Sequence, residues 1–529
     1  MYKCDQSLKF KILIILPLFI LVCNFFLPVN SEESVKTSNF NYTSNSTTNS
    51  SIINTTTPIK HLIIIFQENV SFDHYFGTYP NAKNLDGEIP FYPSPDTPSV
   101  DGLTKSILYN NTNLSDPFRM NIDDAKIVAS CGNNHTYTAI QKSYNSGFMN
   151  KFVEANGEIE EGCTPHLTMG YFDGNTVTAL WNYAQNFAMS DNFHSTITGP
   201  SLPGHINLIS GQTHGVIPEN LDDNTSHGTL IGDADSLFDA CSNGTKLYMT
   251  GKNIGDLLNK KEITWGWFSG GFKPTSNVTS DGKVVCGSSH VNILGKNVTD
   301  YVVHHEPFQY YESTANPFHL PPSSVEMIGH SDQANHQYDL SDFWAAVDND
   351  NIPSVSFLKA PYYQTGHTKA SDPVNEQKFL VDTINKLQNI SNWNNTAIII
   401  AYDDTGGWYD HRMPPIVMQS NDPKYDAIAG PGLCGIPDKD SYLDRCGYGG
   451  RVPFIIISPW AKVNYIDHQL TDQTSILRFI EDNWDLGRIG DNSFDEKAGQ
   501  ILNMFNFTKG HYAEKLFLNS TDGTIMNKE

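Results

Sequence analysis

The stretch "HLIIIFQEN" (His61–Asn69) joins a run of large apolar residues to a carboxylate and an amide. The run is continuous, rich in β-branched residues and too short for a buried helix. Continuous apolarity is typical of a strand that is covered on both faces, as in parallel α/β sheets. Three other runs share this pattern and predict further buried strands: Ser354–Ala360, Thr396–Tyr402 and Val452–Pro459.

Helical patterns lie between these runs. Asn175–Phe187 and Asn375–Asn389 carry apolar residues at helical spacing, and Thr471–Trp484 does so after a threonine that can cap a helix. Strands that alternate with helices predict an α/β/α sandwich around a largely parallel sheet. The stretch at about 212–340 is rich in Gly, Asn and Ser, and we expect it to form an inserted cap over the site.

Acidic and amide side chains follow two of the predicted strands at the point where each strand ends. Glu68 and Asn69 follow the first run, and Asp403 and Asp404 follow the run that ends at Tyr402. Ligands of open α/β sheets bind beyond the carboxyl ends of the strands, so we expect these side chains to meet. Clustered carboxylates repel one another, and a hard divalent cation with oxygen ligands removes that repulsion. A strand-end turn would also favour Asp and Asn, but two pairs in the same relation to a strand indicate a metal site.

A third polar element is the segment "TGPSLPGH" (Thr198–His205). Its glycines and prolines predict a rigid loop around Ser201, although a serine in such a turn is more often structural. A free hydroxyl is a weak nucleophile, and the sequence contains no G-x-S-x-G elbow. A metal ion that touches the Ser201 oxygen would lower its pKa and so activate it.

Charge and the N-terminus bear on the class and location of the protein. The 529 residues include 58 acidic and 34 basic side chains, for a net charge of −24, which argues against a nucleic-acid-binding protein. Residues 1–31 have the basic start and apolar run of an export signal, with a retained membrane anchor as the alternative. We expect a Ser/Thr/Asn-rich stalk at 32–57, a catalytic domain at 58–510 and a tail at 511–529. After Trp484 we expect a helix before the polar tail.

The cysteines and the glycosylation sequons fit an exported chain. Six cysteines follow the signal and none forms a C-x-x-C pair, so disulfides are favoured over a zinc ribbon. Pairing of nearest neighbours predicts Cys131–Cys163, Cys241–Cys286 and Cys434–Cys446. Asn-x-Ser/Thr sequons recur, among them Asn41, Asn45, Asn54, Asn224, Asn277 and Asn519. Asn69 also starts a sequon, but we expect it to face the metal and to carry no glycan.

Several long motifs occur in one order along most of the chain. They are "IKHLIIIFQENVSFDHYFGTYP", "CGNNHTYTAIQKSYNSGFMNKFVE", "TGPSLPGHINLISG", "HHEPFQYYESTANPFHLPP", "GHSDQANHQYDLSDFWAAV", "GHTKASDP", "AYDDTGGWYDHRMPP" and "GRVPFIIISPWA". Together they resemble the phosphoesterase family of non-specific phospholipase C and secreted acid phosphatases, within the alkaline phosphatase superfamily. The resemblance implies an alkaline-phosphatase-like fold and hydrolysis of phosphate esters.

The resemblance also implies roles for individual residues. It makes Ser201 the nucleophile and places three histidines around the phosphoryl group: His135, His305 and His367. His305 is chosen over the adjacent His304. It implies one divalent metal ion (Ca²⁺, Mg²⁺, Mn²⁺ or Zn²⁺) held by Glu68, Asn69, Ser201, Asp403 and Asp404. The pairs Asp73-His74 and Asp410-His411 are expected to be structural.

The chain departs from the family pattern at two places. Thr-Lys-Ala precedes Ser371-Asp372 where an E-H-P-G type segment is usual, which leaves the role of Asp372 open, and Gly204 stands where Asn is typical. The alternatives are a sulfatase-like hydrolase and a non-catalytic binding protein, but a sulfatase motif would have Arg at the position of His205. The expected substrates are phosphate esters, phospholipids included. Hydrolysis of a phospholipid would bring the protein into transient contact with a membrane surface. The cap is expected to select the substrate.

Overall fold

The computed structural model describes residues 54–277, 284–417 and 447–526. The apolar run of the opening stretch forms strand β1 (His61–Gln67) inside an eight-stranded sheet, where Leu62 to Phe66 are fully buried. Each neighbour of β1 is itself one of the apolar runs, so both edges of β1 are paired, and the complete burial of its side chains shows that both faces are covered. The strand order is β14 (Gln337–Asp339), β11 (Trp265–Ser269), β15 (Val355–Lys359), β1, β16 (Thr396–Tyr402), β17 (Phe454–Ile457), β4 (Ala188–Ser190) and β18 (Tyr465–Asp467).

The register of this sheet brings three strand ends to one edge. β1 and β16 run parallel with Gln67 opposite Tyr402, so the residues that follow them are neighbours. On the other side of β1, Ile65 lies opposite Leu358, which carries Lys359 to the same edge. In this sheet β17 runs antiparallel to both of its neighbours, and the other pairs are parallel. The prediction of a largely parallel sheet is therefore confirmed.

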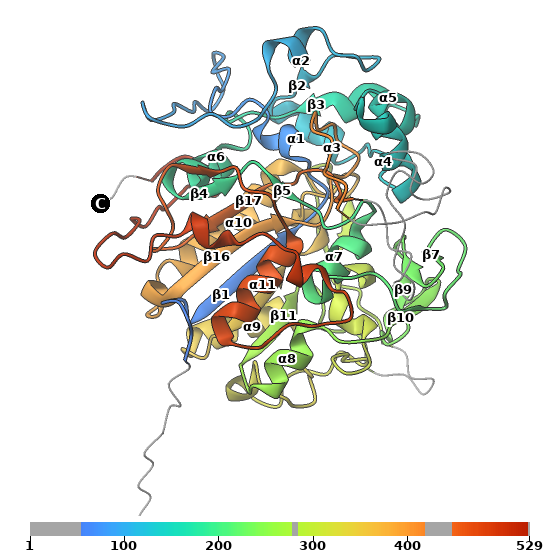
Figure 1. Ribbon diagram of the computed structural model, residues 1–529, viewed down its shortest axis with the longest axis vertical. Helices are drawn as coiled ribbons and strands as arrows, with labels where there is room; N and C mark the ends of the chain where they lie inside the picture. Colours follow the sequence, from blue (N-terminus) through green and yellow to red (C-terminus); the bar gives the residue numbers. More distant parts are fainter. Residues whose placement is uncertain (1–53, 278–283, 418–446, 527–529) are drawn as a thin grey trace, which may run out of the picture. The chain divides into compact units, whose positions relative to one another are not determined.

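Helices cover both faces of the sheet. Figure 1 shows α7 (Ser201–Ser210), α8 (Ile254–Lys260) and α11 (Gln473–Trp484) in front of it. Helix α10 (Pro373–Leu387) links β15 to β16, and this crossover moves along the sheet toward β18. The chain from β4 through α7 to β11 moves in the opposite direction, toward β14. Because parallel crossovers are right-handed, opposite directions place these helices on opposite faces. The predicted α/β/α sandwich is confirmed.

Two expected helix features need correction. The N-cap of α11 is Asp472, whose side chain accepts a hydrogen bond from Thr474 N, and not Thr471, which lies in the short strand β19 (Thr471–Asp472). An aspartate caps at least as well as a threonine. After Trp484, 3-10 turns are the only helical structure in the described residues, so the expected C-terminal helix is wrong. Leu516 and Leu518, in the expected tail, are buried, and Gln388 Nε2 donates to Leu516 O.

The stretch at about 212–340 is not wholly a cap. It supplies β11 and β14 to the central sheet and α8 to one helical layer. The strand "WGWFS" of β11 is fully buried, although Gly, Asn and Ser dominate the residues around it. Its aromatic residues favour a strand, but the composition of the whole stretch concealed this short element.

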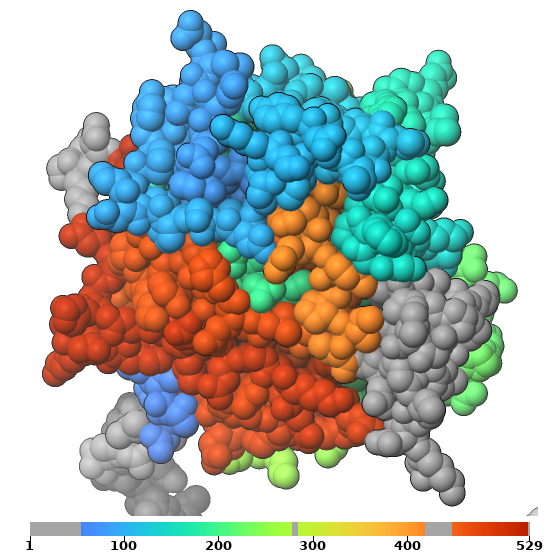
Figure 2. All heavy atoms as spheres, turned by 45° about the horizontal axis from the view of Figure 1, so that its top comes forward, coloured from blue at the N-terminus to red at the C-terminus, as the bar shows by residue number. Residues whose placement is uncertain are grey.

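A helical layer also covers the segment that follows β16. Tyr409 packs edge-on against Phe152 of α5 (Phe152–Ala155), with ring centroids 5.0 Å apart, and Met413 lies beside Gly147. In Figure 2 the orange atoms of the segment that follows β16 lie beside the teal atoms of the region that contains α5. The segment that follows the turn at Asp403 and Asp404 is thus packed against residues outside the sheet.

Several expectations lie wholly or mainly outside the described residues. These are the signal at 1–31, most of the stalk at 32–57 and the Cys434–Cys446 pair. Within the described ranges, helices that combine the length and the apolarity needed to cross a bilayer do not occur.

Candidate active site

Three carboxylates meet beyond the ends of β1 and β16. Glu68, Asp403 and Asp404 are each at most 2% exposed, although carboxylates are seldom buried without partners. The register alone places Glu68 beside Asp403, because each is the first residue after its strand. The strand-end pairs therefore meet as the sequence predicts.

Asn69 turns the chain at this edge. Its φ of 57° lies in the left-handed region, where Asn is one of the few side chains that are tolerated. This conformation lets Asn69 N donate to Asp403 Oδ1 at 2.8 Å. With the amide oxygen directed at His367 Nε2, 2.7 Å away, the amide nitrogen lies 2.8 Å from both oxygens of Asp404.

Ser201 reaches the carboxylates from the first residue of α7. Its Oγ donates to Glu68 Oε2 at 3.0 Å and lies 3.4 Å from Asp404 Oδ2. One turn later, a Cβ on Gly204 would come within 2.5 Å of Asp403 O. Glycine at this position therefore allows α7 to approach the turn after β16.

Two residues of the site, Lys359 and His205, were missed in the sequence. Lys359, the last residue of β15, is buried and forms a short ion pair with Glu68 Oε1. His205 Nδ1 lies 2.8 Å from Ser201 O, and its Nε2 lies 3.3 Å from Glu68 Oε1. Both had a signal: Lys359 ends an apolar strand as Glu68 follows one, and His205 lies four residues after Ser201 on a single helix.

The three predicted histidines lie around this cluster. His305 Nε2 lies 3.3 Å from Glu68 Oε2, and the ring of His305 stacks on His205 with centroids 5.2 Å apart. The rings of His135 and His367 are 5.7 Å apart. His305, not the half-buried His304, is therefore the one that faces Glu68. His135 is half-buried, and its Nδ1 donates to Asn133 O at 2.8 Å.

Burial controls the protonation of these groups. Burial and then the Glu68 carboxylate raise the pKa of Asp403 well above its usual range, and burial and then Asp403 do the same for Asp404. Burial lowers the pKa of His205 and of His305 well below the usual value, and that of His367 to about 3. These three histidines are therefore neutral at pH 7.

The residues at this edge fit a divalent cation. With all three carboxylates ionised, as a bound cation would hold them, the Lys359 ammonium leaves two negative charges, which one divalent ion would neutralise. Asp403 Oδ2 is buried without a hydrogen-bond partner among the described residues, and so is His205 Nε2. Unpartnered buried atoms are costly, and carboxylate, amide and hydroxyl oxygens are the ligands that hard cations prefer. These two atoms therefore offer lone pairs to a cation at the place where positive charge is needed to balance the carboxylates.

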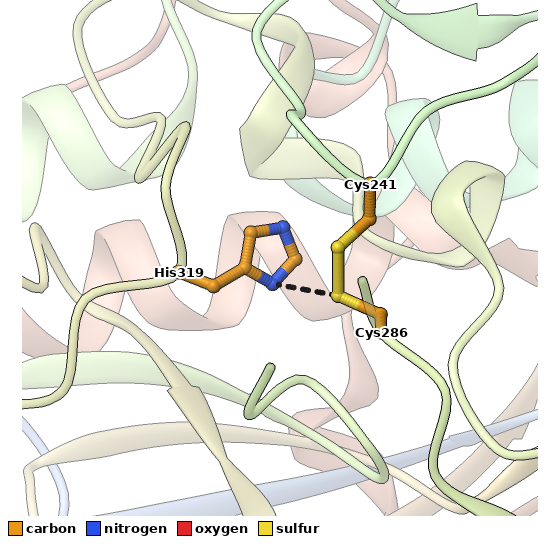
Figure 3. Close-up of side chains that lie close together, drawn as sticks. All are labelled: Cys241, Cys286 and His319. Atoms are coloured by element: carbon orange, nitrogen blue, oxygen red, sulfur yellow. Dashed lines mark hydrogen bonds between the residues drawn. A yellow bond between two sulfur atoms is a disulfide. The ribbon is translucent and has the colours of Figure 1, made fainter. Parts of the chain in front are cut away.

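Two other clusters of potential ligands do not fit a metal ion. Cys241 and Cys286 form a disulfide of 2.02 Å, so neither sulfur is a thiolate, and Figure 3 shows His319 Nδ1 beside Cys286 Sγ at 3.5 Å. Asp73 and Asp410 already pair with the buried Arg451 guanidinium. The pairings Cys241–Cys286 and Cys131–Cys163, the latter at 2.03 Å, are both confirmed.

Other matched residues have structural roles. Asp372 is the N-cap of α10, where its Oδ1 accepts from Val374 N at 2.9 Å and Asn375 N at 3.0 Å. Asp73 accepts from His411 Nδ1 at 2.7 Å, which ties the helix after β1 to the turn after β16.

The buried pair of His411 and Asp73 makes the stability of the fold decrease at alkaline pH. Burial opposes the charged imidazole, but Asp73 outweighs it and raises the pKa of His411 to about 9. The stabilisation is fully present below the unfolded pKa of about 6.5 and is lost as pH rises through 9. We expect wild type to lose more free energy of unfolding between pH 7 and 9.5 than His411→Asn, by on the order of 2 kcal/mol. Denaturant titrations at several pH values measure this, and parallel curves for the two proteins would contradict it.

Burial also prevents glycosylation of the sequon at Asn69. Its side chain is 0% exposed and contacts Asp404, so an attached sugar has no room. We expect intact-glycopeptide mass spectrometry of the active protein to find Asn69 unmodified. Asn277, which is exposed and also starts a sequon, is the control site in the same digest. Substantial occupancy at Asn69 would remove this residue from the site.

Comparison with known proteins agrees with this reading of the motifs. The sequence model of the Phosphoesterase family matches residues 59–487. Phospholipase C A of Mycobacterium tuberculosis is 22% identical over 458 residues, which cover 85% of this chain and 78% of that protein. Non-hemolytic phospholipase C of Pseudomonas aeruginosa is 24% identical over 467 residues, covering 85% of this chain and 57% of that protein.

A solved structure is also similar. It is a protein in the alkaline phosphatase superfamily from Vibrio parahaemolyticus, with a TM-score of 0.27 and 12% identity. The match covers 59% of this chain and 60% of that one.

Proposed function

This chain belongs to the Phosphoesterase family and hydrolyses phosphoric ester bonds, and we propose that it does so through Ser201 as nucleophile, with one divalent metal ion. The observation that carries the proposal is the Ser201 hydroxyl, 3.0 Å from Glu68 Oε2 in a cluster of three buried carboxylates with a single buried lysine beside them. The metal would be held by Glu68, Asn69, Ser201, Asp403 and Asp404. When bound, it would stabilise the serine alkoxide and the charge that develops on the phosphoryl oxygens.

The first step transfers the phosphoryl group to the enzyme. Ser201 Oγ forms a bond to phosphorus while the bond from phosphorus to the alcohol oxygen breaks. The hydroxyl proton passes to Glu68 Oε2, the nearest acceptor. Lys359, bound to Glu68 Oε1, holds that carboxylate in place.

The leaving alcohol must gain a proton, and His135 is the residue we assign to this task. Its Nδ1 donates to the Asn133 carbonyl at 2.8 Å, so Nε2 is the ring atom that can exchange a proton with a ligand. Half-burial leaves His135 accessible, whereas His205, His305 and His367 are kept neutral by burial. Water then attacks the phosphoserine and gives one proton to His135, while the bond from phosphorus to Ser201 Oγ breaks. Ser201 Oγ takes its proton back from Glu68, and phosphate, or a phosphate monoester from a diester, is released.

The relatives named phospholipase C make a phospholipid one candidate substrate and a water-soluble phosphate monoester the other. We propose that the protein acts outside the cytoplasm, since disulfides persist in oxidising compartments and two are present. Purified protein should be assayed side by side on nitrophenyl phosphate, phosphatidylcholine vesicles and nitrophenyl sulfate. Turnover of neither phosphate ester would refute the proposal, and preference for the sulfate would indicate a sulfatase.

A further inference from the structure

A cavity that His135 helps to line lies beside Ser201. Its volume is about 480 Å³. It borders the site, because its lining includes Pro200, which precedes Ser201, and His135. Asp233, also in the lining, accepts from Leu202 N at 2.8 Å in the first turn of α7.

Asn133 in this lining is an unpartnered buried amide. It is 2% exposed, yet neither Oδ1 nor Nδ2 has a hydrogen-bond partner in the described part of the chain. A buried amide without a partner costs about 1–3 kcal/mol, so such a group is expected where a ligand supplies the partner. The backbone is fixed on both sides, since Asn134 N donates to Asn156 O and a Cβ on Gly407 would lie 2.9 Å from Asn133 Cβ.

The charges of the lining restrict what the cavity can accept. Glu158, Asp223 and Asp233 supply carboxylates, and the lining contains neither Lys nor Arg. Glu158 pairs with Lys369 at 2.7 Å, which leaves Asp223 and Asp233 as the uncompensated charges. Ionised carboxylates accept hydrogen bonds from donors and repel anions. The cavity therefore suits a ligand that donates hydrogen bonds and carries no negative charge.

We propose, on the basis of the function assigned above, that this cavity binds the alcohol portion of the phosphate ester. It selects alcohols that present O–H or N–H donors over alcohols without donors and over anionic alcohols, and Asn133 positions the alcohol. His135 lines the same cavity, so the oxygen that leaves phosphorus departs beside the group that protonates it.

The first test compares two leaving groups. Asn133→Leu keeps the side-chain size and removes both polar atoms. We expect its loss of kcat/KM to be at least about tenfold larger for glycerol phosphate than for nitrophenyl phosphate, which lacks donors, because one to two hydrogen bonds are lost. Equal losses on both substrates by a folded variant would overturn the proposal.

The second test uses charge and does not depend on a buried substitution. Asp223→Asn removes a rim carboxylate, and Asp222→Asn is its matched control, exposed in the same loop and outside the lining. We expect Asp223→Asn to raise kcat/KM for phosphoglycerate relative to glycerol phosphate by about threefold, with no change of ratio in Asp222→Asn.

The same ratio in both variants would overturn the selection by charge. If Asn133→Leu does not fold, the comparison of Asp223→Asn with Asp222→Asn decides whether the cavity binds the alcohol portion of the substrate. A wild type that hydrolyses neither phosphate ester would refute the proposed function instead of the role of the cavity.

Discussion

Asp404→Asn is expected to lose metal affinity by more than about tenfold and to lose nearly all turnover. The substitution keeps the shape of the side chain but removes one of three carboxylate charges at the edge of the sheet. With metal bound and its carboxylate ligands ionised, Glu68 and Asp403, with Lys359 beside them, then present one negative charge in place of two. The attraction for a divalent ion falls accordingly.

The same variant should be at least as stable as wild type without metal. Burial and Asp403 hold the pKa of Asp404 well above its usual range, which means that its ionised form is disfavoured in the folded protein. The substitution removes the cost of burying this carboxyl, charged or protonated, among other carboxylates, so in EDTA the melting temperature of Asp404→Asn should equal or exceed that of wild type. With saturating metal the order should reverse, because the ion stabilises wild type more.

Metal content by elemental analysis, turnover and melting curves with and without EDTA test both expectations. Asp382→Asn is the matched control, because Asp382 is exposed on α10 and pairs only with Lys378 in the described structure. A variant that binds less than a tenth of the wild-type metal yet keeps full turnover would show that the metal has no catalytic role.

The central sheet and the strand-end carboxylates could be predicted because they depend on local pattern. β1 and β16 are continuous apolar runs, and Glu68 and Asp403 follow them directly. The meeting of these residues needs only the rule that parallel strands end at one edge. The strand β11 was missed because five residues inside a Gly, Asn and Ser-rich stretch give too short a pattern.

Other parts of the site depend on packing that no local pattern records. Lys359 ends the sequence "VSFLK", where a terminal lysine is ordinarily solvated, and only the strand register places it against Glu68. Asp233 and Asn133 come from loops about a hundred residues apart and share a cavity because of the tertiary fold. A histidine four residues after Ser201 is visible in the sequence, but its burial against Glu68 is not.

Ser201→Ala is expected to reduce kcat by about a thousandfold or more, since the attack on phosphorus loses its nucleophile. The loss should be in kcat more than in KM, because the cluster that binds the phosphoryl group remains. Ser201→Thr should retain part of the activity, since it keeps the hydroxyl and adds only a methyl group beside Glu68 Oε2.

The rival account is direct attack by water, with Ser201 serving only to start α7 and to donate to Glu68. The two accounts differ in stereochemistry at a chiral phosphorus. Two in-line displacements through a phosphoserine give retention, and one displacement by water gives inversion. Acid quenching of wild type during turnover should also yield a phosphopeptide that contains Ser201. Inversion in wild type, or near-normal turnover by Ser201→Ala, would reject the covalent mechanism and leave the carboxylate cluster as a metal site that activates water.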